Sequence, residues 1–195
     1  PILHTVTPTG FVGSLDWLPH TDKLLVGSRH GKAILLDIWA KDELSTSPTN
    51  SFSESQVMRE IQSTVLHMVD RGKAWVNSVQ FSPDGKFFSV GDSLGILGIY
   101  KLEKEENTKD NLAITNIANF KLEDSILDIE WAADGEFLYA GGEDFAITII
   151  STEYWEPVHR IARDRWVQFI SSSCGSSHVA VGGVTSEFSL FDVGN

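Results

Sequence analysis

The sequence has 195 residues, of which 42% are hydrophobic, and its 27 acidic against 15 basic residues give a formal net charge of −12. The length and the hydrophobic content suit one sizeable globular domain or a piece of a larger protein. The negative charge argues against a nucleic-acid backbone or an anionic membrane surface as the partner.

The single cysteine, Cys174, excludes an internal disulfide and a cysteine-rich zinc site, and it indicates a reducing compartment. No apolar run reaches the length of a membrane span, and no secretory signal peptide opens the sequence. We therefore expect an intracellular protein, cytoplasmic or nuclear, without a membrane partner.

The chain opens with a short β-like run at residues 2–6, which we expect to form an N-terminal strand. Residues 11–38 then contain three apolar runs separated by turn residues, with Leu15 and Trp17 alternating on one face of the first run. Three such strands with short connections predict an antiparallel meander.

Polar residues follow at 41–55, where serine and threonine dominate and predict an inserted surface loop. A further β-like run covers residues 57–61. The apolar cluster within 64–73 fits a helical turn or a packed loop, and we favour the packed loop. We interpret the charged stretch 103–110 as a hairpin tip.

Residues 75–102 carry the clearest copy of the meander. Val79 and Phe81 alternate on one face, and Ser82–Gly85 forms a turn in which proline presets φ and glycine accepts a positive φ. Two more copies follow, so that the repeat cores cover residues 11–38, 75–102, 125–152 and 166–193.

A glycine closes the second run of every copy, and about 41 residues separate the last two of these glycines. One more β-like run follows each of the first three copies, the later two at 113–122 and 157–161, which predicts four strands for each unit. An aromatic residue recurs at one position in the first strand of three copies, which predicts a core between units: Trp17, Phe81 and Trp131.

This repeat, with its Phe81–Gly85 turn and its apolar third strand, resembles the WD repeat, the blade of a β-propeller. The Trp-Asp pair that names the family is degenerate, as Leu36-Asp37, Tyr100-Lys101, Ile150-Ser151 and Phe191-Asp192, and the family's Gly-His dipeptide is absent. Asp144 occupies the family's turn-aspartate position, and we expect it to cap its turn by accepting backbone N–H groups.

The resemblance implies an all-β propeller with four blades of four antiparallel strands, and the family's rings usually need about seven blades. Three interpretations follow. The chain is part of a larger propeller, which we favour, or two copies complete one ring, or four blades close an atypical ring. In propellers of this kind the N-terminal strand often pairs with the last three strands.

No catalytic, metal or cofactor motif is present. The six histidines lack i,i+4 spacing, no HExxH or CxxC occurs, and the Gly10–Gly13 and Gly95–Gly98 runs lack the phosphate-loop pattern. Cys174 lies in a serine- and glycine-rich turn without a neighbouring base, so we expect an exposed, unreactive thiol.

The candidate contact site lies around the last inter-copy connection, where aromatic residues and arginines interrupt an acidic chain. Arginine and tryptophan are enriched at interaction hot spots. The WD-repeat resemblance implies a non-enzymatic scaffold that binds proteins or peptides within a multiprotein complex. The alternative is a reader of a modified peptide tail or a nucleic-acid ligand, which would need an aromatic cage of Tyr154, Trp155 and Trp166. The candidate contact residues are Tyr154, Trp155, Arg160, Arg163, Arg165 and Trp166.

Overall fold

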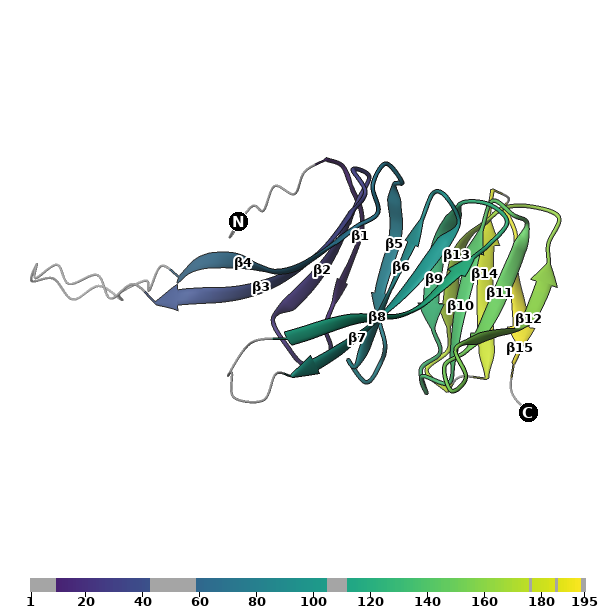
Figure 1. The fold of residues 1–195 in the computed structure, drawn as a ribbon. Coiled ribbons are helices and arrows are strands. Elements are labelled where there is room, and N and C mark those ends of the chain that lie inside the picture. Colours follow the sequence, from purple (N-terminus) through teal and green to yellow (C-terminus); the bar gives the residue numbers. More distant parts are fainter. Residues whose placement is uncertain (1–9, 43–58, 105–111, 176, 185, 194–195) are drawn as a thin grey trace, which may run out of the picture.

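The computed structural model describes residues 10–42, 59–104, 112–175, 177–184 and 186–193, and it places fifteen strands in four sheets. Each sheet is a consecutive antiparallel meander, which confirms the predicted all-β propeller class (Figure 1). The expected strand at 2–6, most of the loop at 41–55 and most of the hairpin tip at 103–110 lie outside the described residues.

Three blades have four strands and the last has three described strands. Blade 1 contains β1 (Val12–Trp17), β2 (Lys23–Ser28), β3 (Lys32–Asp42) and β4 (Arg59–Asp70). Blade 2 contains β5 (Val76–Phe81), β6 (Phe87–Asp92), β7 (Ile96–Lys104) and β8 (Leu112–Lys121). Blade 3 contains β9 (Ile126–Trp131), β10 (Phe137–Gly142), β11 (Ala146–Ser151) and β12 (Glu156–Ala162), and blade 4 contains β13 (Val167–Ser172), β14 (His178–Gly183) and β15 (Phe188–Asp192).

The turn between β5 and β6 has the predicted chemistry. Gly85 has a φ of 68° and donates its backbone N–H to the Ser82 carbonyl at 2.9 Å. Oδ1 of Asp84 accepts the Lys86 backbone N–H at 3.0 Å and the Ser82 hydroxyl at 2.7 Å. The local sequence alone therefore determines this reversal of the chain.

The packed loop expected at 64–73 is wrong, because β4 continues as a strand to Asp70. The pairing of β3 with β4 shifts register between Leu35, opposite His67, and Leu36, opposite Val65. This bulge inserts Leu66 and interrupts the two-residue alternation that identifies a strand in sequence.

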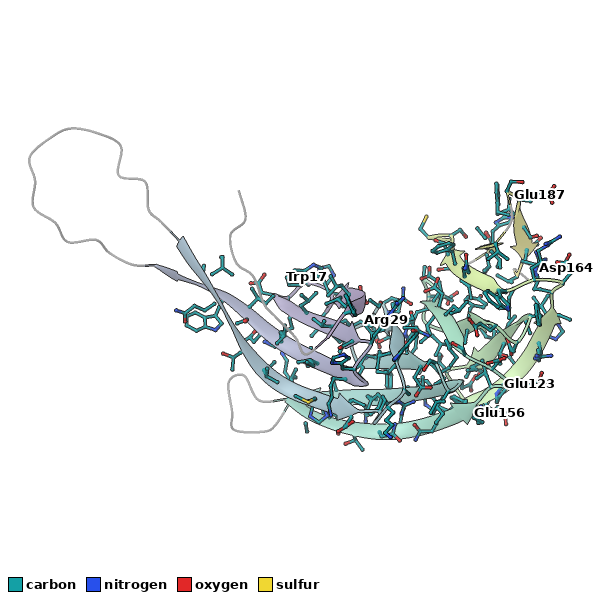
Figure 2. All side chains as sticks on the ribbon, turned by 90° about the horizontal axis from the view of Figure 1, so that it is seen from above. Trp17, Arg29, Glu123, Glu156, Asp164 and Glu187 are labelled. Atoms are coloured by element: carbon teal, nitrogen blue, oxygen red, sulfur yellow. The ribbon has the colours of Figure 1, made fainter. Side chains whose placement is uncertain are left out.

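The four blades form an open arc in which each first strand contacts the first strand of the next blade (Figure 2). Blade 1 and blade 4 lie at opposite ends of this arc in both views and do not meet. The described residues therefore do not form a closed four-blade ring.

Side chains on each first strand bind the backbone of the next first strand. Oδ2 of Asp16 accepts the Phe81 N–H at 2.6 Å, and Oε1 of Gln80 accepts the Trp131 N–H at 2.7 Å. Oε1 of Glu130 accepts the Ser172 N–H at 2.7 Å. The edge amides of the first strands of blades 2, 3 and 4 are thus satisfied by the preceding blade, which fixes the order and register of the blades.

Apolar cores fill the spaces between blades. Three of the four core clusters combine residues of two adjacent blades. The fourth, which contains Val26, Ile34 and Leu36, comes from blade 1 alone. This cluster therefore lies on a face of blade 1 that packs against no other blade among the described residues.

The predicted burial of the recurring aromatic residues is confirmed for two of three. Phe81 and Trp131 are each 4% exposed, whereas Trp17 is 52% exposed. The prediction for Trp17 is wrong because its burial requires a preceding blade, and the described residues place none beside β1.

Candidate interaction site

The six candidate contact residues lie along β12 and at both of its ends. Tyr154 and Trp155 precede this strand, Arg160 lies within it, and Trp166 follows it. A strand rises by about 3.3 Å per residue, so the seven residues of β12 separate its ends by about 20 Å. The structure therefore does not bring Tyr154, Trp155 and Trp166 together, and these residues do not form an aromatic cage.

Trp155 belongs to the structural core between blades 2 and 3. Its ring centroid lies 5.1 Å from that of Phe87 and 6.2 Å from that of Trp131, both in edge-to-face geometry. Its φ of 53° fits a tight turn before β12. Tyr154 beside it is 66% exposed, so only the tyrosine of this pair presents its ring to a partner.

Arg160 holds two loops together. Its Nη2 lies 3.1 Å from Glu123 Oε2 and 3.2 Å from Asp144 Oδ2, and the Asp144 side chain is 2% exposed. The guanidinium therefore neutralises a buried carboxylate, and its main contribution is to the structure of blade 3.

The predicted backbone capping by Asp144 is wrong. The Oδ2 atom of Asp144 contacts Arg160. The Oδ1 atom is buried and has no hydrogen-bond partner among the described residues. The equivalent capping occurs in blade 2, where Oδ1 of Asp92 accepts the N–H groups of Leu94 at 3.0 Å and Ile96 at 2.9 Å. The capping role of Asp92 was not predicted, because Asp92 lies two positions before the place in blade 2 that corresponds to Asp144.

Arg163, Arg165 and Trp166 gather in the loop between β12 and β13. Nη2 of Arg163 donates to Ser189 Oγ at 2.8 Å, and its guanidinium carbon lies 5.4 Å from the centroid of Phe191. The Arg165 side chain is 59% exposed, and Trp166 is 40% exposed. Arg163 thus ties the loop to β15, while the other two side chains face outward.

A hollow of about 390 Å³ lies beside this loop. Its walls include the side chains of Arg163, Arg165 and Trp166 together with two acidic residues, Asp164 and Glu187. Figure 2 shows these two acidic residues near each other at the far end of the arc. A hollow with both signs of charge and one indole ring can bind a polar peptide that carries an anchoring side chain.

The described residues offer neither a cluster of metal ligands nor a helix that could span a membrane. No group of three or more His, Cys, Asp or Glu side chains gathers there as a metal site. Cys174 is exposed, as expected for a surface thiol. Within the described part of the chain, no helix has the length and apolar character to cross a membrane.

The family profile described as "WD domain, G-beta repeat" matches residues 63–99. Protein HIR1 of Kluyveromyces lactis is 27% identical over 157 residues, which cover 76% of this chain and 18% of that protein. The Periodic tryptophan protein 2 homolog of Schizosaccharomyces pombe is 32% identical over 109 residues, which cover 52% of this chain and 12% of that protein. The chain thus matches less than a fifth of the length of either relative.

Proposed function

Because this chain belongs to the WD-repeat family of β-propellers, we propose that it is a non-enzymatic scaffold that binds protein partners within a multiprotein complex. WD-repeat propellers generally act as scaffolds for protein interaction. A rigid arc of meanders supports loops that can vary without disturbing the core. The lone exposed thiol of Cys174 suits an intracellular setting, cytoplasmic or nuclear.

The observation that carries the proposal is the hollow beside the β12–β13 loop and the β14–β15 connection. It presents an exposed guanidinium, Arg165, and a partly exposed indole, Trp166, beside two carboxylates. Arginine and tryptophan give the largest losses when truncated at interfaces. The partner is a protein or peptide that offers an acidic group to Arg165 and an apolar side chain to Trp166. The net charge of −12 disfavours a nucleic acid.

The test compares protein capture by the wild-type chain with capture by Arg165→Glu and by Trp166→Ala. Both variants change exposed groups, so the blades should unfold at the same denaturant concentration as in the wild type. We expect each variant to lose a defined partner, with binding weakened by about 30-fold, since hot-spot truncations cost about 2 kcal/mol or more.

Lys86→Glu is the matched control, because the Lys86 side chain is 69% exposed and lies in the β5–β6 turn, away from the hollow. This charge reversal should leave the partner set unchanged. An identical partner set for all four proteins would reject the hollow as the contact site. The alternative function, a reader of a modified tail, has no aromatic cage to support it among the proposed residues.

A further inference from the structure

The side chain of Trp75 is exposed at the connection between blades 1 and 2. Its backbone N–H donates to Ser93 Oγ at 2.9 Å, and its carbonyl accepts the Ser93 N–H at 2.8 Å. The residue is nevertheless 53% exposed. A tryptophan whose backbone is fixed while its ring faces water offers a large contact area to a partner at a low cost in conformational entropy.

Arg29 stacks on this indole from the β2–β3 turn of blade 1. Its guanidinium carbon lies 5.5 Å from the ring centroid, which is the distance of a cation–π contact. The Arg29 N–H donates to the Phe11 carbonyl at 2.8 Å, so this turn is fixed as well. Arg71 and Arg160 each pair with a carboxylate, whereas the described residues offer none to Arg29. The N–H groups of Arg29 are therefore available to an acidic ligand.

The connections around this pair carry positive charge in an acidic chain. Residues 29–32, 70–75 and 92–95 contain two arginines and two lysines against two aspartates, a net charge of +2. Both aspartates already pair with a cation of these connections. Arg29 and Lys73 are the exposed cations that these pairs leave over. An acidic group is therefore attracted to this place, although the whole chain has a charge of −12.

The corresponding connections of blade 3 have the opposite charge. Residues 122–125 and 143–145 contain four carboxylates and no cation. Ser125 occupies in blade 3 the place of Trp75 in blade 2, as the pairing of β9 with β10 and of β5 with β6 shows. The attraction for an acidic group thus belongs to the junction of blades 1 and 2 and is not shared by every blade.

We propose that Arg29 and Trp75 form a second contact site, which binds an acidic segment of a protein partner. A carboxylate of the partner accepts two N–H groups from the edge of the Arg29 guanidinium, and an apolar side chain next to it packs on the indole. The site lies between two described blades and shares no residue with the hollow beside the β12–β13 loop. Figure 2 shows Arg29 near the middle of the arc, away from Asp164 at its end.

A single-stranded nucleic acid can use the same two groups, with a phosphate on the guanidinium and a base on the indole. Binding of a phosphate backbone depends on several cations along its path. Here Arg29 and Lys73 alone remain exposed and without a carboxylate in the three connections. The site therefore suits a peptide with one or two carboxylates better than a polyanion.

The first test follows the indole N–H resonances of the six tryptophans by NMR while an acidic peptide, acetyl-Glu-Glu-Leu-Glu-Glu-amide, is added to the chain. The resonance that disappears in Trp75→Phe identifies Trp75. We expect it to move with the acidic peptide and to stay in place with the peptide in which Gln replaces every Glu. No movement with the acidic peptide, or equal movement with both peptides, would overturn the proposal.

The second test compares the dissociation constant of the acidic peptide between two variants. Arg29→Gln should weaken binding about 10-fold, because a hydrogen bond between charged groups is lost. Lys86→Gln is the matched control, since it removes the same charge from an exposed side chain in the β5–β6 turn, at the other end of β5 from Trp75. The control should change binding by less than about 2-fold. Equal losses would show that the net charge of the chain governs binding, and would reject the site.

A third measurement adds oligothymidine, a single-stranded nucleic acid, in place of the peptide. We expect it to bind more weakly than the acidic peptide. Tighter binding that is lost in Arg29→Gln would overturn the peptide site in favour of a nucleic acid.

This site and the hollow fail separately. Arg165→Glu should leave the movement of the Trp75 resonance unchanged, because Arg165 lies in the β12–β13 loop. Loss of the Trp75 response with intact capture through Arg165 and Trp166 would reject the second site alone. Unchanged capture in the Arg165 and Trp166 variants would reject the hollow and leave the second site standing.

Discussion

Nε of Arg71 donates to Oδ2 of Asp92 at 3.1 Å, with the two side chains 10% and 1% exposed. The same guanidinium donates from Nη2 to the Ile96 carbonyl at 3.0 Å and reaches the Tyr100 hydroxyl at 3.4 Å. Since Asp92 also accepts two backbone amides, this ion pair ties the β4–β5 connection to the β6–β7 turn. Blade 2 lacks the family's Gly-His dipeptide, and this buried network instead joins two of its connections.

We predict that Arg71→Met destabilises the protein by about 3 kcal/mol, because removing one partner leaves a buried carboxylate without its counter-ion. The measurement is the free energy of unfolding from urea titration. Arg165→Met is the matched control, since Arg165 is exposed and lies 3.8 Å from Asp164. Its effect should stay within about 0.5 kcal/mol. Equal effects of the two substitutions would show that the buried pair adds nothing to stability.

Asp128 gives a prediction on pH dependence. Burial raises the pKa of its carboxyl above the ordinary 3.8, although the N–H groups of Ile170 and Ile129 and the Ser78 hydroxyl act in the opposite direction. A raised pKa means that the folded state holds this proton when the unfolded state has lost it. The contribution of Asp128 to stability therefore falls as pH rises from about 3.8 through the folded pKa.

The experiment measures the unfolding free energy of the wild type minus that of Asp128→Asn across this pH range, and we expect the difference to fall as pH rises. Asp84→Asn is the control, because the contribution of Asp84 to stability should change with pH in the opposite direction. Burial acts to raise the pKa of Asp84, but hydrogen bonds from Ser82 and Lys86 and the Lys86 charge lower it overall. The Asp84 difference should decrease as pH falls through the folded pKa. A parallel response of the two variants would contradict the assignment for Asp128.

Local features of the sequence predicted the blades. The alternation of Val79 and Phe81 and the turn at Ser82–Gly85 depend on neighbouring residues only, and both are present in the structure. The predicted β-like run at 57–61 overlaps the start of β4, but the continuation of this strand to Asp70 was missed because the bulge at Leu66 breaks its alternation. Local reasoning fails where the partner strand, rather than the sequence itself, keeps a segment in the sheet.

The candidate site was predicted in part. Closeness in sequence placed Tyr154, Trp155 and Trp166 in one group, but the intervening strand β12 separates them in space. Glu187 lines the hollow only because the chain folds back, since it lies in the β14–β15 connection, far from Arg163 and Arg165 in the sequence. Such pairing of distant loops depends on how blades 3 and 4 pack, and no local pattern encodes it.

The last prediction concerns two tryptophans at the same place in two blades. Trp131 is 4% exposed and donates from Nε1 to the buried Ser89 hydroxyl at 3.0 Å, whereas Trp17 is 52% exposed. Trp131→Ala should cost about 3–5 kcal/mol, because it leaves a cavity between blades 2 and 3 and removes the donor to the Ser89 hydroxyl. Trp17→Ala should cost less than about 1 kcal/mol, because about half of the Trp17 residue is already exposed.

Urea titration measures the cost of each substitution as the change in the free energy of unfolding. The larger cost is expected for Trp131→Ala, because blade 3 packs against blade 2 through a core that contains Trp131. A cost of Trp17→Ala as large as that of Trp131→Ala would contradict this expectation, because it would require Trp17 to be packed in a core as well.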